Sequence, residues 1–213
     1  MAQFAFDTFT DTDGTALESH TADDGGTWTE HTLYTTGAMV ISDANRARRS
    51  IGNNTCYYHS GAPASANYYV QCNVHQLSSV SQQGIAGRID TVLDTMYYAR
   101  HNTAFERWDL RKLVAGVDSA LGNFSQTLSN GVTYTAILKM DGDQISLYVD
   151  GVLRVGPITD SDISAAGKAG FRISGATGET NSTGKHLDNF LAVDLTGWGP
   201  LIGGERNQLV LAA

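Results

Sequence analysis

The fold is decided by five short runs of sequence: Trp108-Asp-Leu-Arg-Lys112, Tyr134-Thr-Ala-Ile-Leu-Lys-Met140, Ile145-Ser-Leu-Tyr-Val149, Val152-Leu-Arg-Val155 and Phe171-Arg-Ile-Ser174. Apolar and polar residues alternate in each run, a pattern that buries one face of a β-strand and leaves the other in water. Antiparallel sheets allow such half-buried strands, whereas parallel sheets covered on both faces do not. The pattern therefore predicts an all-β protein built as an antiparallel β-sandwich.

Turn residues between the runs predict how neighbouring strands connect. Asp150-Gly151 stands directly between two of the runs, and a type I′ hairpin turn needs positive φ at both of its central positions. Asp141-Gly142 predicts a second hairpin. Upstream, Gly84-Ile-Ala-Gly-Arg-Ile89 and Met96-Tyr-Tyr-Ala-Arg100 are predicted to form a central strand pair, with Gly87 allowing close approach or a bulge.

Composition indicates one globular unit rather than two. A chain of 213 residues with 41% hydrophobic residues has enough apolar surface for a core, and all-β domains of this length are commonly single. We expect a sandwich over residues 1–196 and a separate C-terminal segment over residues 197–213, which ends in the apolar run Leu209-Val-Leu-Ala-Ala213.

The charge balance excludes nucleic acid as a partner. The net charge is −8, from 14 basic and 22 acidic residues, whereas nucleic-acid binding depends on clustered Lys and Arg. Arg46, Arg48 and Arg49 form the one basic cluster. Adjacent residues of a strand face opposite ways, so this cluster is interpreted as a solvated loop.

No segment predicts export or a membrane span. The first residues, Met1-Ala-Gln-Phe-Ala-Phe-Asp7, lack the basic and apolar regions of a leader, and no window approaches about 18 uninterrupted apolar residues. We therefore expect no membrane partner and no classical secretion. This expectation favours a particle that is assembled inside a cell.

The two cysteines do not make a disulfide framework. If Gly61-Ala-Pro-Ala-Ser-Ala66 is the turn of a hairpin, Cys56 and Cys72 face each other across it. A cross-strand bridge and two reduced, half-buried thiols both fit this arrangement. We prefer the reduced thiols because the sequence carries no leader.

Several motifs together resemble the concanavalin A-like lectin/glucanase superfamily, and most closely its laminin-G-like branch. The resemblance covers about residues 4–195 and rests on Phe6-Asp-Thr-Phe9, Asp13-Gly14-Thr15, Gly25-Gly26-Thr27-Trp28, Gly84-Ile-Ala-Gly-Arg88, Leu147-Tyr-Val-Asp-Gly151, Gly170-Phe171-Arg172 and Leu187-Asp-Asn-Phe190. It implies a jelly-roll sandwich in which the first strand pairs with the last. Members of this superfamily include carbohydrate-binding modules, lectins, glycosidases and accessory domains of bacteriophage virion proteins, so the fold alone does not select a function.

The sequence does not favour catalysis. Glycosidases of this superfamily carry Glu-x-Asp-x-x-Glu on one strand, which aims two carboxylates at the scissile bond. That motif is missing. Glu106 and Asp109 are three residues apart, which places them on opposite faces of a strand. We therefore predict that the protein is not an enzyme.

Calcium is the one predicted cofactor. Asp7, Asp11 and Asp13 place three carboxylates in a short loop, and the resemblance implies that Asp188 on the last strand lies nearby. Ca²⁺ takes six to eight oxygen ligands from loops of this kind. Ordinary turn residues that cap their own backbone give the same pattern, so both interpretations stand.

Aromatic residues supply the candidate ligand site. Tyr57-Tyr58, Tyr68-Tyr69 and Tyr97-Tyr98 are adjacent pairs on predicted strands, so one ring of each pair must face away from the core. Such rings suit sugar stacking, a protein interface or simple cross-strand packing. The predicted ligand-binding residues are Tyr58, Tyr69, Tyr98, Arg88 and Trp108.

These observations favour a non-catalytic binding or structural module. The expected setting is a phage virion, as a capsid decoration or fibre-associated adhesion protein that binds carbohydrate or another surface. Expected partners are other virion proteins, a second copy of the chain and polysaccharide. The alternatives are a glycoside hydrolase and a secreted carbohydrate-binding lectin of the same fold. Residues 197–213 are predicted to be a docking segment that adds to a neighbour's sheet edge.

Overall fold

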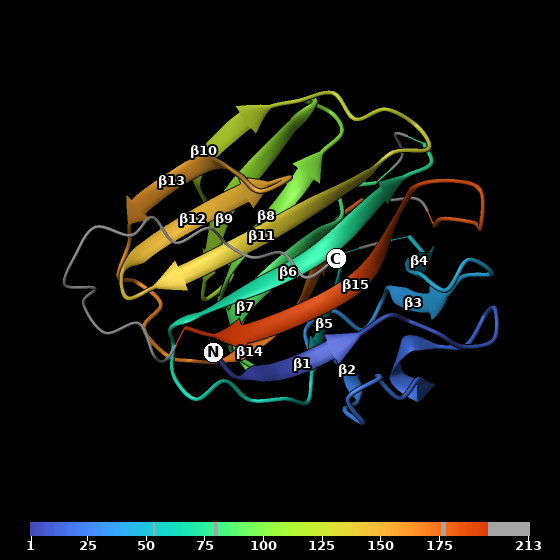
Figure 1. Ribbon diagram of the computed structural model, residues 1–213, viewed down its shortest axis with the longest axis horizontal. Coiled ribbons are helices and arrows are strands. Elements are labelled where there is room, and N and C mark those ends of the chain that lie inside the picture. The colour runs from blue at the N-terminus through green and yellow to red at the C-terminus, as the bar shows by residue number, and fades with distance from the viewer. Residues whose placement is uncertain (53, 79–80, 176–177, 196–213) are drawn as a thin grey trace.

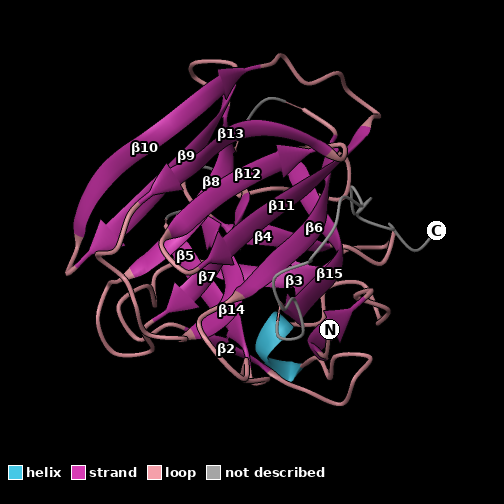
Figure 2. Ribbon diagram, turned by 60° about the vertical axis from the view of Figure 1, so that its left-hand side comes forward, coloured by secondary structure: helices cyan, strands magenta, loops and turns pink. Residues whose placement is uncertain are grey.

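The structure is a computed structural model that describes residues 1–195 except 53, 79–80 and 176–177. In the described residues almost every element is a strand, and the strands form two antiparallel sheets (Figures 1 and 2). The prediction of an antiparallel two-sheet jelly-roll sandwich is confirmed. The predicted docking segment, residues 197–213, lies outside the described residues.

Eight of the described strands form the first sheet, which faces the viewer in Figure 1. Its order is β13-β12-β11-β6-β15-β4-β3, and β1 also pairs with β15. The strands are β1 (Gln3–Asp7), β3 (Ala38–Ile41), β4 (Ala47–Ile51), β6 (Tyr68–Gln76), β11 (Thr133–Asp141), β12 (Gln144–Val149), β13 (Val152–Thr159) and β15 (Lys185–Asp194).

The other seven described strands form the second sheet, in the order β10-β9-β8-β7-β14-β5-β2. These strands are β2 (Trp28–Glu30), β5 (Thr55–His59), β7 (Gly84–Ile89), β8 (Met96–Asn102), β9 (Arg107–Val114), β10 (Val117–Ser125) and β14 (Lys168–Ile173). The predicted pairing of β7 with β8 is confirmed.

The core lies between the sheets and is centred on three aromatic rings. Trp28 of β2 stacks on Phe171 of β14, with ring centroids 4.8 Å apart and planes 12° from parallel. Phe190 of β15 meets Trp28 edge-on at 4.9 Å. Because Phe190 belongs to the first sheet and the other two rings to the second, this cluster holds the two sheets together.

The predicted hairpins are present. β12 pairs with β13 across Asp150 and Gly151, whose φ angles of 52° and 74° are the positive values that a type I′ turn needs. β11 pairs with β12 across Gly142. β1 pairs with β15, as the family resemblance implied.

The predicted hairpin that brings Cys56 and Cys72 together is wrong. Cys56 lies on β5 in the second sheet and Cys72 on β6 in the first, because the segment between these strands carries the chain from one sheet to the other. Cys72 belongs to the core, whereas Cys56 packs on the other side of the second sheet. Both thiols are free and buried.

The interpretation as a solvated loop is wrong for Arg48 and Arg49, whereas Arg46 does lie in the partly exposed turn before β4. Arg48 and Arg49 lie on β4, and Arg49 is fully buried. The Arg49 Nη1 donates to the carbonyl of Gly175 at 2.8 Å, and the Arg48 Nη1 donates to the carbonyl of Glu179 at 2.7 Å. These arginines therefore satisfy backbone carbonyls of the segment before β15.

Within the described part of the chain, no helix has the length and apolar character that a membrane crossing requires. The one helical element described there is the 3-10 turn Leu17–Ser19 (Figure 2).

Candidate functional site

The outer face of the second sheet, turned away from the core, carries a group of polar side chains on neighbouring strands. Trp108 and Leu110 of β9 lie in the core, so the residues that alternate with them face outward. We call the following outward-facing side chains of β8, β9 and β10 the polar ladder: Tyr98, Arg100, Asn102, Asp109, Arg111 and Asp118.

Asp118 fixes one part of the polar ladder. Its Oδ1 accepts hydrogen bonds from the Tyr98 hydroxyl and from the Arg111 Nε, both at 2.9 Å. Burial, with a smaller contribution from the nearby Asp118, raises the pKa of Tyr98 to about 12, so the hydroxyl remains a donor at neutral pH. Burial lowers the pKa of Arg111, but the hydrogen bonds and charges of Asp118 and Tyr98 together outweigh burial, and the net pKa is raised.

Asp109 fixes the other part. Its carboxylate accepts from the Arg107 Nε at 2.6 Å and from the Asn102 Nδ2 at 3.0 Å. Carboxylate, amide and guanidinium groups held in one plane on adjacent strands form directed donors and acceptors of the kind that recognise sugar hydroxyls.

Tyr34, from the turn after β2, covers part of this face. It packs in one cluster with Ala86 and Tyr98, its hydroxyl donates to Asp94, and its ring lies 4.3 Å from the Arg172 guanidinium carbon. Tyr34 therefore adds an aromatic ring to the outer face beside Tyr98, although it was not among the predicted site residues.

Two predicted ligand residues lie on this face. Tyr58 is half-buried, and Tyr98 is the buried aromatic member of the polar ladder. The two belong to one row of the sheet in which Gly170 and Ala86 stand between them. Tyr69 is half-buried on β6 of the first sheet, on the opposite side of the molecule. The predicted tyrosines thus do not converge on a single site.

The other two predicted ligand-binding residues, Arg88 and Trp108, do not face a ligand, and this corrects the prediction. Trp108 is fully buried in the core, where its Nε1 donates to Gln126 at 2.9 Å. Arg88 is also buried, and its guanidinium donates to the carbonyls of Ala66, Gly142 and Ile163. Both residues hold the sandwich together rather than face a ligand.

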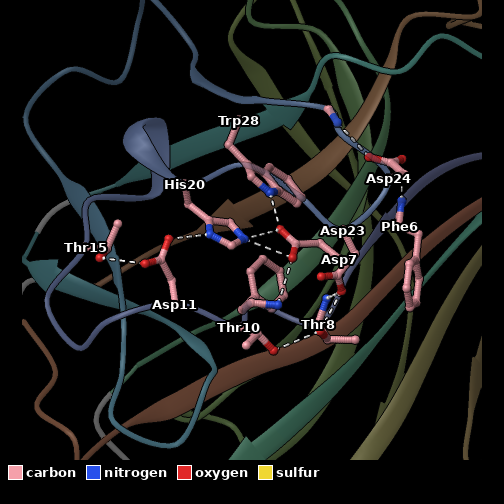
Figure 3. A network of polar contacts seen from close by, with 12 residues as sticks. Phe6, Asp7, Thr8, Thr10, Asp11, Thr15, His20, Asp23, Asp24 and Trp28 are labelled. Atoms are coloured by element: carbon pink, nitrogen blue, oxygen red, sulfur yellow. Dashed lines mark hydrogen bonds and ion pairs between the residues drawn. The ribbon is translucent and has the colours of Figure 1, made fainter.

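The predicted calcium residues Asp7 and Asp11 bind protein donors (Figure 3). His20 lies between them: its Nε2 is 3.0 Å from Asp7 Oδ1 and its Nδ1 is 2.9 Å from Asp11 Oδ2. Asp7 also accepts from the Trp28 Nε1 at 2.6 Å. Burial lowers the pKa of His20, but the hydrogen bonds to Asp11 and Asp7 and the charges of these carboxylates together outweigh burial, and the net pKa is raised. An imidazolium thus supplies the positive charge between these carboxylates.

The other two predicted calcium residues are separately engaged. Asp13 accepts from the Asn181 Nδ2 at 3.0 Å, and Asp188 lies 3.8 Å from the Arg46 Nε. Among the described residues, no group of three or more His, Cys, Asp or Glu side chains is arranged to hold a metal ion. The donor set does not fit calcium in this arrangement, and the predicted ion is not confirmed.

The described glutamates give no glycosidase pair on the outer face. Glu106 lies in a turn before β9. Glu18 and Glu30 affect one another electrostatically, but Glu30 bonds Thr55 and Glu18 bonds the hydroxyl of Tyr57, whose ring is in the core.

Comparisons with known proteins place the fold but not a family. No family model matches the chain, and no curated protein matches its sequence. Solved structures do match it. The carbohydrate-binding module CBM66 from Bacillus subtilis is 16% identical with a TM-score of 0.63, over 76% of this chain and 92% of that one.

Two further structures show the same architecture. The Bacillus licheniformis β-glucanase is 12% identical with a TM-score of 0.59, over 90% of this chain and 97% of that one. The VIP36 exoplasmic/lumenal domain in its Ca²⁺/Man2-bound form is 6% identical with a TM-score of 0.55, over 85% of this chain and 87% of that one. The chain therefore has the concanavalin A-like β-sandwich fold.

Proposed function

We propose that this protein is a non-catalytic carbohydrate-binding module that uses the outer face of its second sheet. The observation that carries the proposal is the polar ladder, in which Asp109 and Asp118 hold amide, guanidinium and phenol groups in fixed positions beside aromatic rings. Fixed polar groups next to an apolar ring match a sugar, which has hydroxyls at its edge and C–H groups on its face. Neighbours of the same fold include a carbohydrate-binding module and a lectin-like domain bound to a mannose disaccharide, which supports the proposal.

The test is a binding panel of neutral and acidic oligosaccharides measured by calorimetry. The variants Tyr58→Ala and Arg111→Gln are expected to weaken binding by about tenfold, because each removes a ring or a charge-assisted donor. Tyr69→Ala is the matched control, since Tyr69 is a half-buried strand tyrosine on the other sheet. Equal loss in all three variants, or loss in Tyr69→Ala alone, would place the site elsewhere.

The finer part of the proposal is the setting. We propose a phage virion component, either a capsid decoration protein or a fibre-associated adhesion protein, with other virion proteins or a second copy as partner. The support is the resemblance to a superfamily whose members include accessory domains of phage virion proteins. Antibody labelling of purified particles tests it, and particles that lack the protein contradict it.

A further inference from the structure

Two arginines on the outer face of the second sheet have no acidic partner. Arg172 of β14 is only 7% exposed, and in the described part of the chain no carboxylate lies within 4.0 Å of its guanidinium or that of Arg100 on β8. The Nε atoms of both arginines are buried and have no hydrogen-bond partner. A cation as buried as Arg172 is normally paired with a carboxylate, so its position beside a second arginine needs an explanation.

The two guanidinium groups converge on one hydroxyl. The Arg100 Nη1 donates to the Ser174 Oγ at 2.8 Å. The Arg172 Nη1 donates to the carbonyl of Ile173 at 2.8 Å and lies 3.5 Å from the same Ser174 oxygen. Between the two strands runs β7, where Gly84 pairs with Arg100 and has no side chain to separate the arginines. A Cβ at Gly84 would lie 1.9 Å from the carbonyl of Ala99, so only glycine fits there.

Nearby groups do not neutralise this pair. Asp109 is opposite Arg100 in the strand register, but its carboxylate binds Arg107 and Asn102. Cys56 is opposite Arg172, and burial raises the pKa of its thiol to about 12, so it carries no charge at neutral pH. Asp94, which lies near Arg172, accepts from the Tyr34 hydroxyl, so among the described residues neither guanidinium has a carboxylate in direct contact.

We propose that Arg100, Arg172 and Ser174 bind the anionic group of an acidic saccharide. Guanidinium groups match planar carboxylates with two parallel hydrogen bonds, so the favoured ligand is a uronic or other carboxylate-bearing sugar, and a sulfate ester on a sugar ring shares the same chemistry. Ser174 and Arg100 are partly exposed, so the anion can reach the pair from solvent. The Tyr34 and Tyr98 rings, which lie against Arg172 and Arg100, provide adjacent apolar surface. The inference rests on the proposed carbohydrate-binding function and names the ligand class.

The experiment compares galacturonic acid oligomers with their methyl esters, in which a methyl group on the carboxyl removes its negative charge and leaves the rest of the sugar unchanged. The wild-type protein is expected to bind the acid form. Each of the variants Arg100→Gln and Arg172→Gln is expected to lower the affinity for this form by about tenfold or more. Arg154→Gln is the matched control: Arg154 lies on β13 of the first sheet against Phe124, and its Nε is also buried without a partner. Arg100→Gln keeps the test valid if Arg172→Gln does not fold, because Arg100 is more exposed.

Further ligands distinguish a sugar carboxylate from a sulfate ester, and they also test the anion site separately from the proposed carbohydrate-binding function. A sulfated oligosaccharide that binds with the same dependence on the two arginines supports the site and assigns the sulfate ester. Equal binding of the acid and its ester, or acid binding unchanged in Arg100→Gln, overturns the inference. Binding of neutral oligosaccharides alone overturns the inference but leaves the proposed function intact, whereas no binding to any sugar overturns the proposed function itself.

Discussion

Asp7 is a buried carboxylate whose partners come from well separated parts of the sequence. It accepts hydrogen bonds from the backbone of Phe9, the ring of His20 and the indole of Trp28 (Figure 3). Asp7 ends β1 rather than lying in the predicted carboxylate loop, and its partner His20 was not among the predicted site residues. Its role could not be predicted because it depends on how the loop after β1 folds back.

His20 is expected to make stability depend on pH. Its pKa is raised above the ordinary 6.5, so its contribution is complete below pH 6.5 and is lost as the pH rises through the folded-state pKa. The variant His20→Asn leaves Asp11 and Asp7 without a cation and should lower the free energy of unfolding by about 3 kcal/mol at acidic pH. Urea unfolding from pH 5 to 9 measures the difference, which should shrink at alkaline pH.

The control for this prediction is His75→Asn, because His75 bonds Thr133 and no carboxylate. A difference between wild type and His20→Asn that grows with pH contradicts the prediction.

Chelation provides a further check on the same network. The melting temperature is expected to stay unchanged with chelator, since the imidazolium already supplies the charge; a fall in melting temperature would support the calcium prediction instead.

Single strands and turns were predicted best where the signal is local. The Asp150-Gly151 hairpin and the β7–β8 pair follow from residues within a few positions of each other. The false pairing of Cys56 with Cys72 assumed that two successive strands share a sheet, and nothing in the turn residues says when the chain crosses to the other sheet. β10 was missed because it lies at a sheet edge and most of its residues are exposed, so it has little hydrophobic alternation.

The β12–β13 hairpin is expected to depend on the backbone conformation of Gly151. Gly151 has a φ of 74°, which an alanine adopts only at a cost, so Gly151→Ala should lower the free energy of unfolding by about 1 kcal/mol. Chemical denaturation of the wild type and the variant measures this change in the free energy of unfolding. Thr127→Ala, at an exposed loop position, is the control and should change stability by less than about 0.5 kcal/mol. An unchanged Gly151→Ala variant would mean that the turn relaxes to another conformation.

For the whole molecule, the described strands and the core that joins them all lie within residues 3–194. The candidate site was only partly predictable: Tyr58 and Tyr98 are on the outer face, but Arg100 and Arg172 become neighbours only through the strand order of the second sheet. Their pairing across β7 is a property of topology, which alternation within one strand does not encode.

A chain ending at residue 196 is expected to fold with unchanged β content, because it keeps every described strand and every described residue of the core cluster. If those residues dock onto a partner, as predicted from their composition, the truncated protein should have a lower native mass than the full chain. Circular dichroism and native mass spectrometry measure the two properties. Loss of folding in the truncated chain contradicts the proposed division at residue 196, and an unchanged native mass contradicts the docking role.

The pairing of β1 with β15 brings the start of the first strand beside the end of the last one. The backbone N–H of Asp194 donates to the carbonyl of Ala2 at 2.9 Å. A surface loop of a carrier protein would need to open by little more than one strand spacing, about 5 Å, to accept residues 2–194 as an insert. The sandwich is therefore suited to domain insertion into a loop of another protein. It is also suited to circular permutation at an exposed turn, because a short linker is enough to join its two ends.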